Sequence, residues 1–310
     1  MKINHISTTQ IAEICGVSQG TVDRALNDRK GISPKTKEKI LTVAKEYGYR
    51  PNIHARTMAG GRSQLIGVIV FDLNNQYFSD ILTNLERYCA EKGCSVVVMF
   101  TNKNEQKELE CIQTLYAMSA DGIALCPINS GEAFENYLLS LNIPVVTFGN
   151  RLNRIPYAGI DNAAAMQDTV NLILSKGYQH LIYVRPALTE KNTYAQTERI
   201  NAFLRICTQN EVAYTVTDLR HAEQSLIPSV KNAFVCPTDL YAIRLLPAAE
   251  KHPAGIVGFD NLRLIDELEL KLDSVAYDID AVASAMADYM IEQKSISEPF
   301  CHTLVCRGSL

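Results

Sequence analysis

The chain has 310 residues, of which 47% are apolar and 21% are charged, which is the composition of an ordinary globular protein. A chain of this length exceeds the size at which one hydrophobic core stops growing, so we expect at least two domains. The sequence contains no run of about 18 apolar residues, as a membrane helix needs. Its N-terminus also lacks the layout of a secretory signal, and we expect a soluble, cytoplasmic protein.

The net charge of −4 is divided unevenly along the chain. Residues 1–62 carry 11 Lys and Arg against 5 Asp and Glu, which makes this segment basic. Residues 63–310 carry 19 Lys and Arg against 29 Asp and Glu, which makes the remainder acidic. This division favours a small polyanion-binding module joined to a larger body that a polyanion would repel.

The nine cysteines occur singly, without a CxxC pair, in segments that we predict to be helices or strands. This pattern is typical of reduced cysteines that serve as small core residues. We therefore expect neither disulfides nor a metal site.

The first 50 residues predict three short helices around one core. The first begins at a cap provided by Ser7, Thr8 or Thr9 and runs to about Cys15, where Gly16 ends it. The second, capped by Ser18, spans residues 19–26, and the third begins at Ser33-Pro34 and ends at Gly48. The apolar positions expected to face the core are Ile11, Ile14, Cys15, Val17, Val22, Ala25, Leu26, Ile40, Leu41, Val43, Ala44 and Tyr47.

Two helices joined by a tight glycine turn are typical of a helix-turn-helix, which presents the start of its second helix to the major groove of DNA. Four residues, Gln19, Gly20, Asp23 and Arg24, fall on that outward face. A Gln amide can bond the edge of adenine, and the planar fork of Arg suits guanine. Ser18, Thr21, Asn27, Tyr49 and Asn52 are predicted to contact the DNA backbone. A helical pair that only packs is the alternative, and the basic charge of the segment argues against it.

The stretch TTQIAEICGVSQGTVDRALN, followed by ISPKTKEKILTVAKEYGYRPNIHARTMAGG, resembles the DNA-binding headpiece and hinge of the lactose/galactose repressor (LacI/GalR) family of bacterial transcription regulators. The resemblance continues through IGVIV, VGFDN and LVCRGS, so it covers essentially the whole chain. It implies a repressor that binds a near-palindromic operator as a homodimer, or as a tetramer, under the control of a small effector. One position departs from the family pattern, because Asp23 stands where Ser is usual. A carboxylate there would repel phosphate unless it accepts from cytosine or pairs with Arg24.

Residues 51–63 are predicted to be a hinge helix and linker. So short and polar a segment does not persist as a free helix in water, so it needs support to fold. By resemblance, two hinge helices form together in the minor groove and Met58 inserts between base pairs as an apolar wedge. A solvated linker that ends at Gly60-Gly61 is the alternative.

From Leu65 onward, buried strands alternate with amphipathic helices, which predicts two parallel, doubly wound sheets covered by helices on both faces. Strands of the first set are expected at 66–71, 95–100, 122–126 and 144–148, with helices at about 78–92, 104–118 and 131–141. Strands of the second set are expected at 157–160, 181–184, 213–217, 233–236, 255–259 and 274–276.

The resemblance implies that this body, residues 64–310, has the fold of type I periplasmic binding proteins. It would consist of an N-subdomain, 64–159 plus 278–296, and a C-subdomain, 160–277 plus 297–310. The headpiece would comprise residues 1–50. Helices 80–92 and 104–118 would form the dimer surface.

Ligands of open α/β sheets bind beyond the carboxyl ends of the strands, where Asn75, Tyr77 and Phe78 follow the first strand. By resemblance, Arg199 and Asp260 match positions that hold polar effector groups, and Lys191 and Thr193 are further candidates. Thr238 and Tyr277 occupy effector positions where relatives carry Asn and Gln. The expected effector is a sugar or sugar derivative, although these departures also fit another ligand or a vestigial pocket.

The sequence lacks the motifs of common enzymes: GxSxG, a P-loop, GxGxxG after the first strand and HExxH. We therefore expect no enzyme activity and no cofactor. The alternative from another class is a sugar-binding transport protein without regulatory DNA binding, which the body alone would suggest. Such a protein would be exported and would not carry a basic headpiece.

Overall fold

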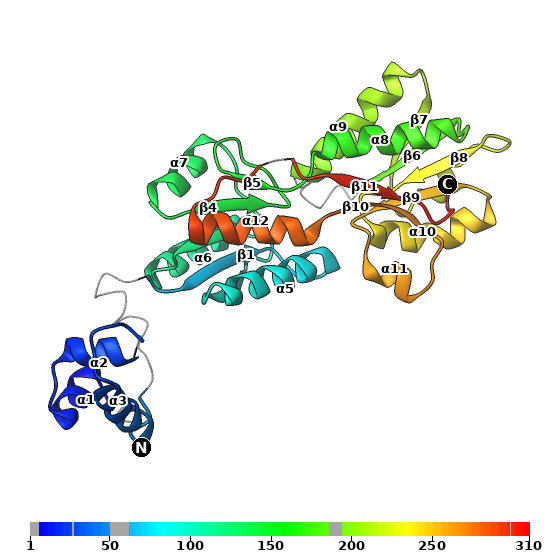
Figure 1. The fold of residues 1–310 in the computed structure, drawn as a ribbon. Helices are drawn as coiled ribbons and strands as arrows, with labels where there is room; N and C mark the ends of the chain where they lie inside the picture. Colours follow the sequence, from blue (N-terminus) through cyan, green and yellow to red (C-terminus); the bar gives the residue numbers. More distant parts are fainter. Residues whose placement is uncertain (1–5, 27, 50–61, 186–193, 298) are drawn as a thin grey trace. The chain divides into compact units, whose positions relative to one another are not determined.

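Two units make up the chain, Met1–Ser63 and Gln64–Leu310. The computed structural model describes residues 6–26, 28–49, 62–185, 194–297 and 299–310. The second unit, here called the body, contains two lobes, each built on one sheet (Figure 1).

The headpiece contains the three predicted helices. They are α1 (Thr8–Cys15), α2 (Gln19–Leu26) and α3 (Pro34–Glu46). Caps define their ends: Ser7 and Gln10 form a capping box on α1, Gly16 adopts the left-handed conformation after it, and Ser33 caps α3. Capping residues were the strongest local signal in this segment, which explains why the bounds agree closely with the prediction.

Three apolar residues expected in the headpiece core are exposed instead: Ile14 (45%), Leu41 (42%) and Tyr47 (56%). The inner face of α3 is formed by Ile40, Val43 and Ala44, and Leu41 lies about 100° around the helix from Ile40. Tyr47 is the C-cap, where the chain leaves the helix. Tyr49 packs against the core in its place, and its N–H donates to the carbonyl of Ala44.

The first lobe has a five-stranded parallel sheet in the order β2-β1-β3-β4-β5. Its strands are β1 (Leu65–Val70), β2 (Ser95–Phe100), β3 (Gly122–Leu125), β4 (Val145–Phe148) and β5 (Tyr157–Ala158). Its helices are α5 (Gln76–Glu91), α6 (Glu105–Ala117), α7 (Glu132–Ser140) and α12 (Ile279–Glu292). Alternate residues of β1 pack on opposite faces, with Ile66 and Val68 toward α5 and α12 and Ile69 toward α6 and α7.

The second lobe has a six-stranded sheet in the order β11-β10-β9-β8-β6-β7. Its strands are β6 (His180–Arg185), β7 (Ala213–Asp218), β8 (Asn232–Val235), β9 (Gly255–Phe259), β10 (Asp273–Tyr277) and β11 (His302–Val305). Its helices are α8 (Asn162–Ser175), α9 (Tyr194–Gln209), α10 (Asp239–Lys251), α11 (Arg263–Glu267) and the 3-10 turn η1 (Glu223–Ser225). α8 and α9 pack on one face and α10 and α11 on the other.

Two details of the sheets correct the prediction. The strand that begins at Tyr157 joins the first sheet beside β4, not the second, because a short connection without a helix keeps the chain at that edge. The second sheet is not wholly parallel, because β11 runs antiparallel to β10. Hydrophobic periodicity predicts that a segment is extended but not which sheet it joins or in which direction it runs.

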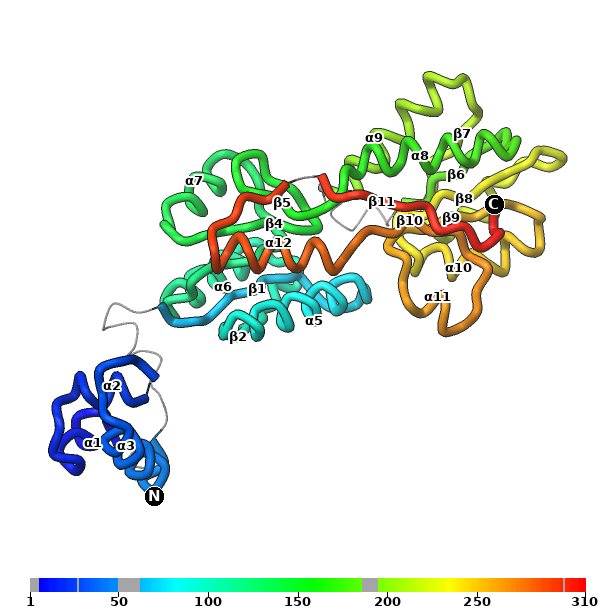
Figure 2. The backbone as a smooth tube through the Cα atoms, viewed as in Figure 1, coloured from blue at the N-terminus to red at the C-terminus, as the bar shows by residue number. Residues whose placement is uncertain are grey.

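The chain passes between the lobes three times, and Figure 2 shows these passages side by side. They lie between β5 and α8, between β10 and α12, and between α12 and β11. The segment after β11 is fixed to the second lobe, because Asp273 Oδ1 accepts hydrogen bonds from the N–H groups of Arg307 and Gly308. The Arg307 guanidinium in turn donates to Asn261 at 2.9 Å, next to Asp260. The C-terminal segment thus supports the turn that follows β9.

Candidate functional site

The helix-turn-helix is held by local contacts between α1 and α2. The Ser18 hydroxyl accepts from the N–H of Thr21 at 3.2 Å and lies 2.9 Å from the Thr21 hydroxyl, so Ser18 caps α2 as expected. The Gln19 amide donates to the Thr8 hydroxyl at 3.1 Å. From α3, Lys39 Nζ donates to the carbonyl of Cys15 at the end of α1. These contacts fix the angle at which the second helix is presented.

Gln19, Gly20 and Arg24 are exposed on α2, whereas Asp23 is half-buried. The Asp23 carboxylate forms an ion pair with Arg29 Nη1 at 3.1 Å, a partner other than the adjacent Arg24. The negative charge of Asp23, which would repel phosphate, is therefore compensated by Arg29 in the turn after α2. Arg24 lies on the exposed face of α2.

The candidate DNA-backbone residues fall in two groups. Ser18 and Thr21 lie at the start of α2, and Tyr49 lies at the edge of the headpiece core. Asn27, Asn52 and the wedge candidate Met58 lie outside the described residues.

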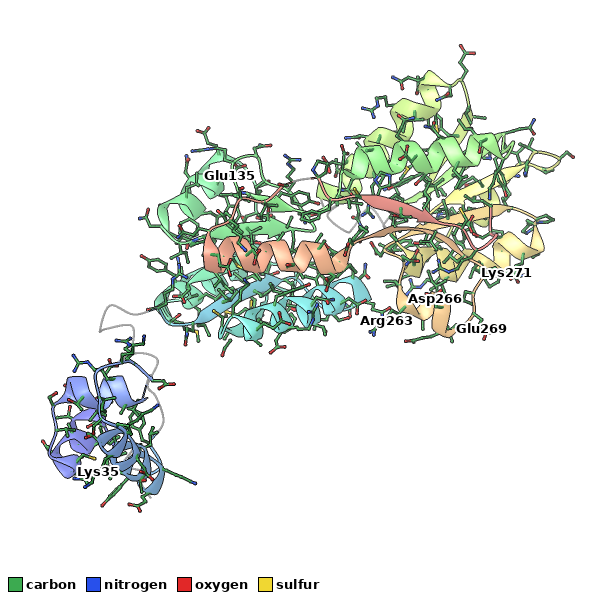
Figure 3. All side chains as sticks on the ribbon, viewed as in Figure 1. Lys35, Glu135, Arg263, Asp266, Glu269 and Lys271 are labelled. Atoms are coloured by element: carbon green, nitrogen blue, oxygen red, sulfur yellow. The ribbon has the colours of Figure 1, made fainter. Side chains whose placement is uncertain are left out.

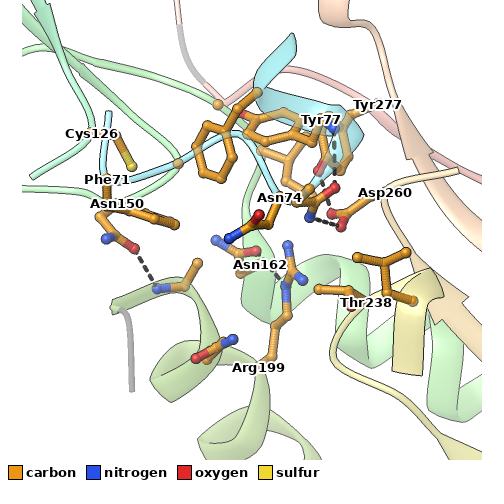
Figure 4. Close-up of a pocket in the computed structure, with 18 of the residues that line it drawn as sticks. Phe71, Asn74, Tyr77, Cys126, Asn150, Asn162, Arg199, Thr238, Asp260 and Tyr277 are labelled. Atoms are coloured by element: carbon orange, nitrogen blue, oxygen red, sulfur yellow. Dashed lines mark hydrogen bonds between the residues drawn. The ribbon is translucent and has the colours of Figure 1, made fainter. Parts of the chain in front are cut away.

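The body contains a cavity of about 260 Å³ lined by both lobes (Figure 4). Seven of the nine predicted effector residues line it: Asn75, Tyr77, Phe78, Arg199, Thr238, Asp260 and Tyr277. Lys191 and Thr193 lie outside the described residues. The seven follow β1, β8 and β9 or lie at the end of β10 and in the first half of α9. The topology thus brings together Asn75 and Asp260, which are 185 residues apart in the sequence.

Aromatic side chains of the first lobe, together with Tyr277 at the end of β10 in the second lobe, form one side of the cavity, here called the aromatic wall. Asn75 caps α5, because its Oδ1 accepts from the N–H of Tyr77 at 3.0 Å, and this places Tyr77 and Phe78 in the first turn. The rings of Tyr77 and Tyr277 meet edge to face at 5.3 Å, and those of Phe71 and Phe78 do so at 4.8 Å. Such a surface suits the apolar face of a sugar or another ring.

Asp260 lies at the junction of the lobes in a backbone conformation that L-residues rarely adopt, with φ of 100°. Its Oδ1 accepts from the Tyr277 hydroxyl at 2.6 Å, and its Oδ2 accepts from Asn75 Nδ2 of the first lobe at 2.6 Å. Burial raises the pKa of the Asp260 carboxyl, against the lowering effects of Arg199 and of these two hydrogen bonds. The strained turn is thus retained by contacts that join the two lobes.

A second contact joins the lobes outside the cavity. Arg263, at the start of α11, extends toward the first turns of α5 (Figure 3), and its Nη2 lies 3.3 Å from the Asp80 carboxylate. Because the Arg263 side chain is 69% exposed, we assign this pair little stabilisation.

Arg199 extends from α9 into the cavity and is 93% buried, with 7% of its surface exposed. Its Nε donates to Asn162 Oδ1 and its Nη1 to the carbonyl of Pro237, both at 2.8 Å. Its guanidinium also lies 4.2 Å from the centre of the Phe259 ring. The side chain is therefore held in one orientation before any ligand arrives.

The prediction missed several polar residues of the cavity, among them Asp72, Asn74, Lys103, Asn150, Asn162 and Gln196. The rule that ligand groups follow strands would have found Asp72 and Asn74 after β1 and Asn150 after β4. Asn162 begins α8 and lies beyond a strand of only two residues, so its position carried no such signal.

Among the described residues, no group of three or more His, Cys, Asp or Glu side chains is arranged to hold a metal ion. In the same part of the chain, no helix is both long and apolar enough to cross a membrane.

Comparison with known proteins gives matches to both units. Residues 9–52 match the family model "Bacterial regulatory proteins, lacI family", and residues 66–265 match "Periplasmic binding protein domain". Catabolite control protein A of Priestia megaterium is 25% identical over 94% of both chains. The sucrose operon repressor of Pediococcus pentosaceus is 25% identical over 91% of this chain and 90% of its own.

The fold is similar to that of the lac repressor dimer solved with operator and the anti-inducer ONPF. The TM-score is 0.80 at 20% identity, over 94% of this chain and 93% of that one. The two family models together with the full-length relatives confirm the resemblance drawn from the motifs. The chain belongs to the LacI family of bacterial regulatory proteins, DNA-binding transcriptional regulators that join a helix-turn-helix domain to a periplasmic-binding-protein-like domain.

Proposed function

We propose that the chain is a transcriptional repressor that binds a near-palindromic operator as a homodimer and changes its DNA affinity when a small effector occupies the cavity of the body. Gln19, Gly20, Asp23 and Arg24 would face the bases and Met58 would enter the minor groove. Ser18, Thr21, Asn27, Tyr49 and Asn52 would contact phosphates. Because its target is DNA, the protein would act in the cytoplasm, at the nucleoid.

One observation carries the proposal: the same chain has an exposed helix-turn-helix face and, in a separate unit, a cavity lined by two lobes. A protein with the cavity alone would fit transport, and one with the headpiece alone would fit constitutive DNA binding. The combination fits regulation, in which a ligand favours one arrangement of the lobes and so alters the headpieces.

The functional parts would be the headpiece, residues 1–50, the hinge, 51–63, and the body, 64–310. A headpiece of this type reads one half-site, so an operator of two half-sites needs two copies on a two-fold axis. We place the dimer surface on α5 and α6, where Tyr116 and Met118 at the end of α6 are exposed. A tetramer would need a further surface, and we propose the dimer.

A sugar or sugar derivative is the effector class that we propose. The aromatic wall of Phe71, Tyr77 and Tyr277 suits the apolar face of a pyranose ring, and the sucrose operon repressor is a relative over nearly its full length. We propose no catalytic activity, because the relatives that match over nearly the full length are regulators.

The test is a two-stage experiment on the full-length protein. Selection from a random duplex library gives the operator, and fluorescence anisotropy then measures the affinity for it with and without each member of a sugar panel. We expect a symmetric consensus and at least one sugar or derivative that changes the affinity. A protein that binds a sugar but selects no sequence would instead be the transport-type protein that its body resembles.

A further inference from the structure

The guanidinium of Arg199 is a buried charge that is only partly satisfied. Its Nε and Nη1 are bonded to Asn162 and Pro237, but among the described residues its Nη2 has no hydrogen-bond partner. In the same set of residues, no carboxylate oxygen lies within 4.0 Å of the guanidinium. A charge that is 93% buried is costly without a counter-ion, so the open edge is suited to receive one.

The carboxylate of the second lobe that lines the cavity does not supply this counter-charge. Both oxygens of Asp260 already accept hydrogen bonds, from Tyr277 and from Asn75. Burial raises the pKa of this carboxyl, while Arg199 and the two hydrogen bonds lower it. Asp72 of the first lobe also lines the cavity, but it is half-buried and its Oδ1 accepts from the N–H of Asn74. In this conformation each oxygen of Asp260 thus already has one acceptor site occupied by a protein donor.

The start of α10 lies at the same place. Thr238, Leu240 and Tyr241 line the cavity, and the Pro237 carbonyl that binds Arg199 immediately precedes them. Thr238 occupies the N-cap position, but its hydroxyl makes no capping bond to the helix. α10 has 13 residues, and the N-terminus of such a helix attracts anions.

The carboxyl of Asp239, the first residue of α10, is engaged elsewhere. Its Oδ1 accepts from the Ser274 hydroxyl at 2.6 Å and its Oδ2 from the N–H of Leu262 at 2.8 Å. Burial and the nearby Asp260 raise the pKa of Asp239 to about 8, so it does not cancel the positive end of the helix near neutral pH.

We propose that the effector carries an oxyanion, either a carboxylate or a phosphate, which binds the open Nη2 edge of Arg199 beside the start of α10, while Asp260 serves to join the lobes. Figure 4 shows Arg199, Thr238 and Asp260 converging on the cavity. This inference rests on the proposed function, because it names the chemical class of ligand for the same cavity. The aromatic wall would pack against the uncharged part of the ligand.

The test is isothermal titration calorimetry on the full-length protein with a panel of pentoses and hexoses. Each sugar is used in three forms: the neutral sugar, its sugar acid and its sugar phosphate. We expect one anionic form to bind at least about tenfold more tightly than its neutral parent, with an affinity that falls as salt is raised. Comparing the sugar acid with the sugar phosphate shows whether the bound oxyanion is a carboxylate or a phosphate.

Substitutions then locate the charge contact. Arg199→Gln should weaken binding of the anionic form by about tenfold or more and remove most of its preference over the neutral parent. Arg199→Lys should recover part of the loss, because it restores the charge without the planar fork. Arg205→Gln, an exposed position on the same helix, is the matched control. Thermal melting of each variant checks folding.

Neutral sugars that bind as tightly as their anionic forms would overturn the inference, and so would an unchanged dissociation constant in Arg199→Gln. Binding of no anionic member of the panel would overturn it as well. In each case, operator binding is measured on the same preparation. If the protein still binds its operator, the proposed function stands and only this inference fails. If operator binding is lost, the proposed function itself is contradicted.

Discussion

Arg24 is the side chain on which base recognition most depends in this account. It is exposed on α2, and the nearby carboxylate of Asp23 is paired with Arg29, so the guanidinium is available to guanine. Arg24→Ala should weaken binding to the selected operator by about 1–3 kcal/mol and relax the preference at one base pair of each half-site. Fluorescence anisotropy with single-base operator variants measures both effects.

Lys35→Ala is the control for Arg24, because Lys35 is an exposed cation at the start of α3 (Figure 3) and is not among the proposed base contacts. It should leave the pattern of base preference unchanged. If Arg24→Ala kept the same preference at every position, Arg24 would not contact a base.

Asp239 predicts a dependence of stability on pH. Its pKa is raised to about 8 in the folded protein, mainly by burial, from an ordinary value of 3.8. The stabilisation linked to this proton is complete below about pH 4 and is lost as the pH rises through about 8, because the buried carboxyl must then ionise. The free energy of unfolding of the wild type should therefore decline over this interval.

Asp239→Asn removes this ionisation, so its unfolding free energy should vary less over the same interval. Urea unfolding at a series of pH values measures the two slopes. Glu250→Gln, an exposed position on the same helix, serves as the reference substitution. Parallel pH profiles for the wild type and Asp239→Asn would show that Asp239 ionises normally in the folded state.

At the scale of elements, caps were more informative than apolar patterns. Ser7, Gly16 and Ser33 fixed the helices of the headpiece, because their backbone geometry and hydrogen bonds are local. The prediction that Leu41 and Tyr47 face the core was wrong, because burial depends on how the three helices pack and on where the chain leaves α3. The strand β11 was missed, since a four-residue edge strand depends on its neighbour β10 rather than on its own pattern.

If Met58 inserts between base pairs, Met58→Ala should reduce operator bending, because it removes the wedge while keeping a good helix former. Met58→Leu should retain the bend, and neither substitution should alter effector binding by the body. A circular-permutation gel assay measures the bend. An undiminished bend in Met58→Ala would exclude the wedge and favour a solvated linker.

For the whole molecule, the alternation of strands and helices was sufficient to predict an α/β body with two sheets after a helical headpiece. The strand-end rule also placed Asn75, Tyr77 and Phe78 beside a cavity. It did not predict that Asn75 and Tyr277 would occupy both oxygens of Asp260, because these partners meet only when the two lobes are assembled. The sequence thus predicted residues that line one cavity, whereas the contacts among them depend on the assembled lobes.

We propose that this chain binds DNA sequence-specifically through two symmetric copies of its headpiece. The most direct measurement is the affinity of the full-length protein for three duplexes over a series of salt concentrations: the selected symmetric operator, the same operator with one half-site scrambled, and a random sequence. We expect the symmetric operator to bind about a thousandfold or more tightly than the random duplex, and we expect scrambling one half-site to remove much of this preference. Affinity should also fall steeply as salt is raised. Equal affinity for all three duplexes would contradict the proposal.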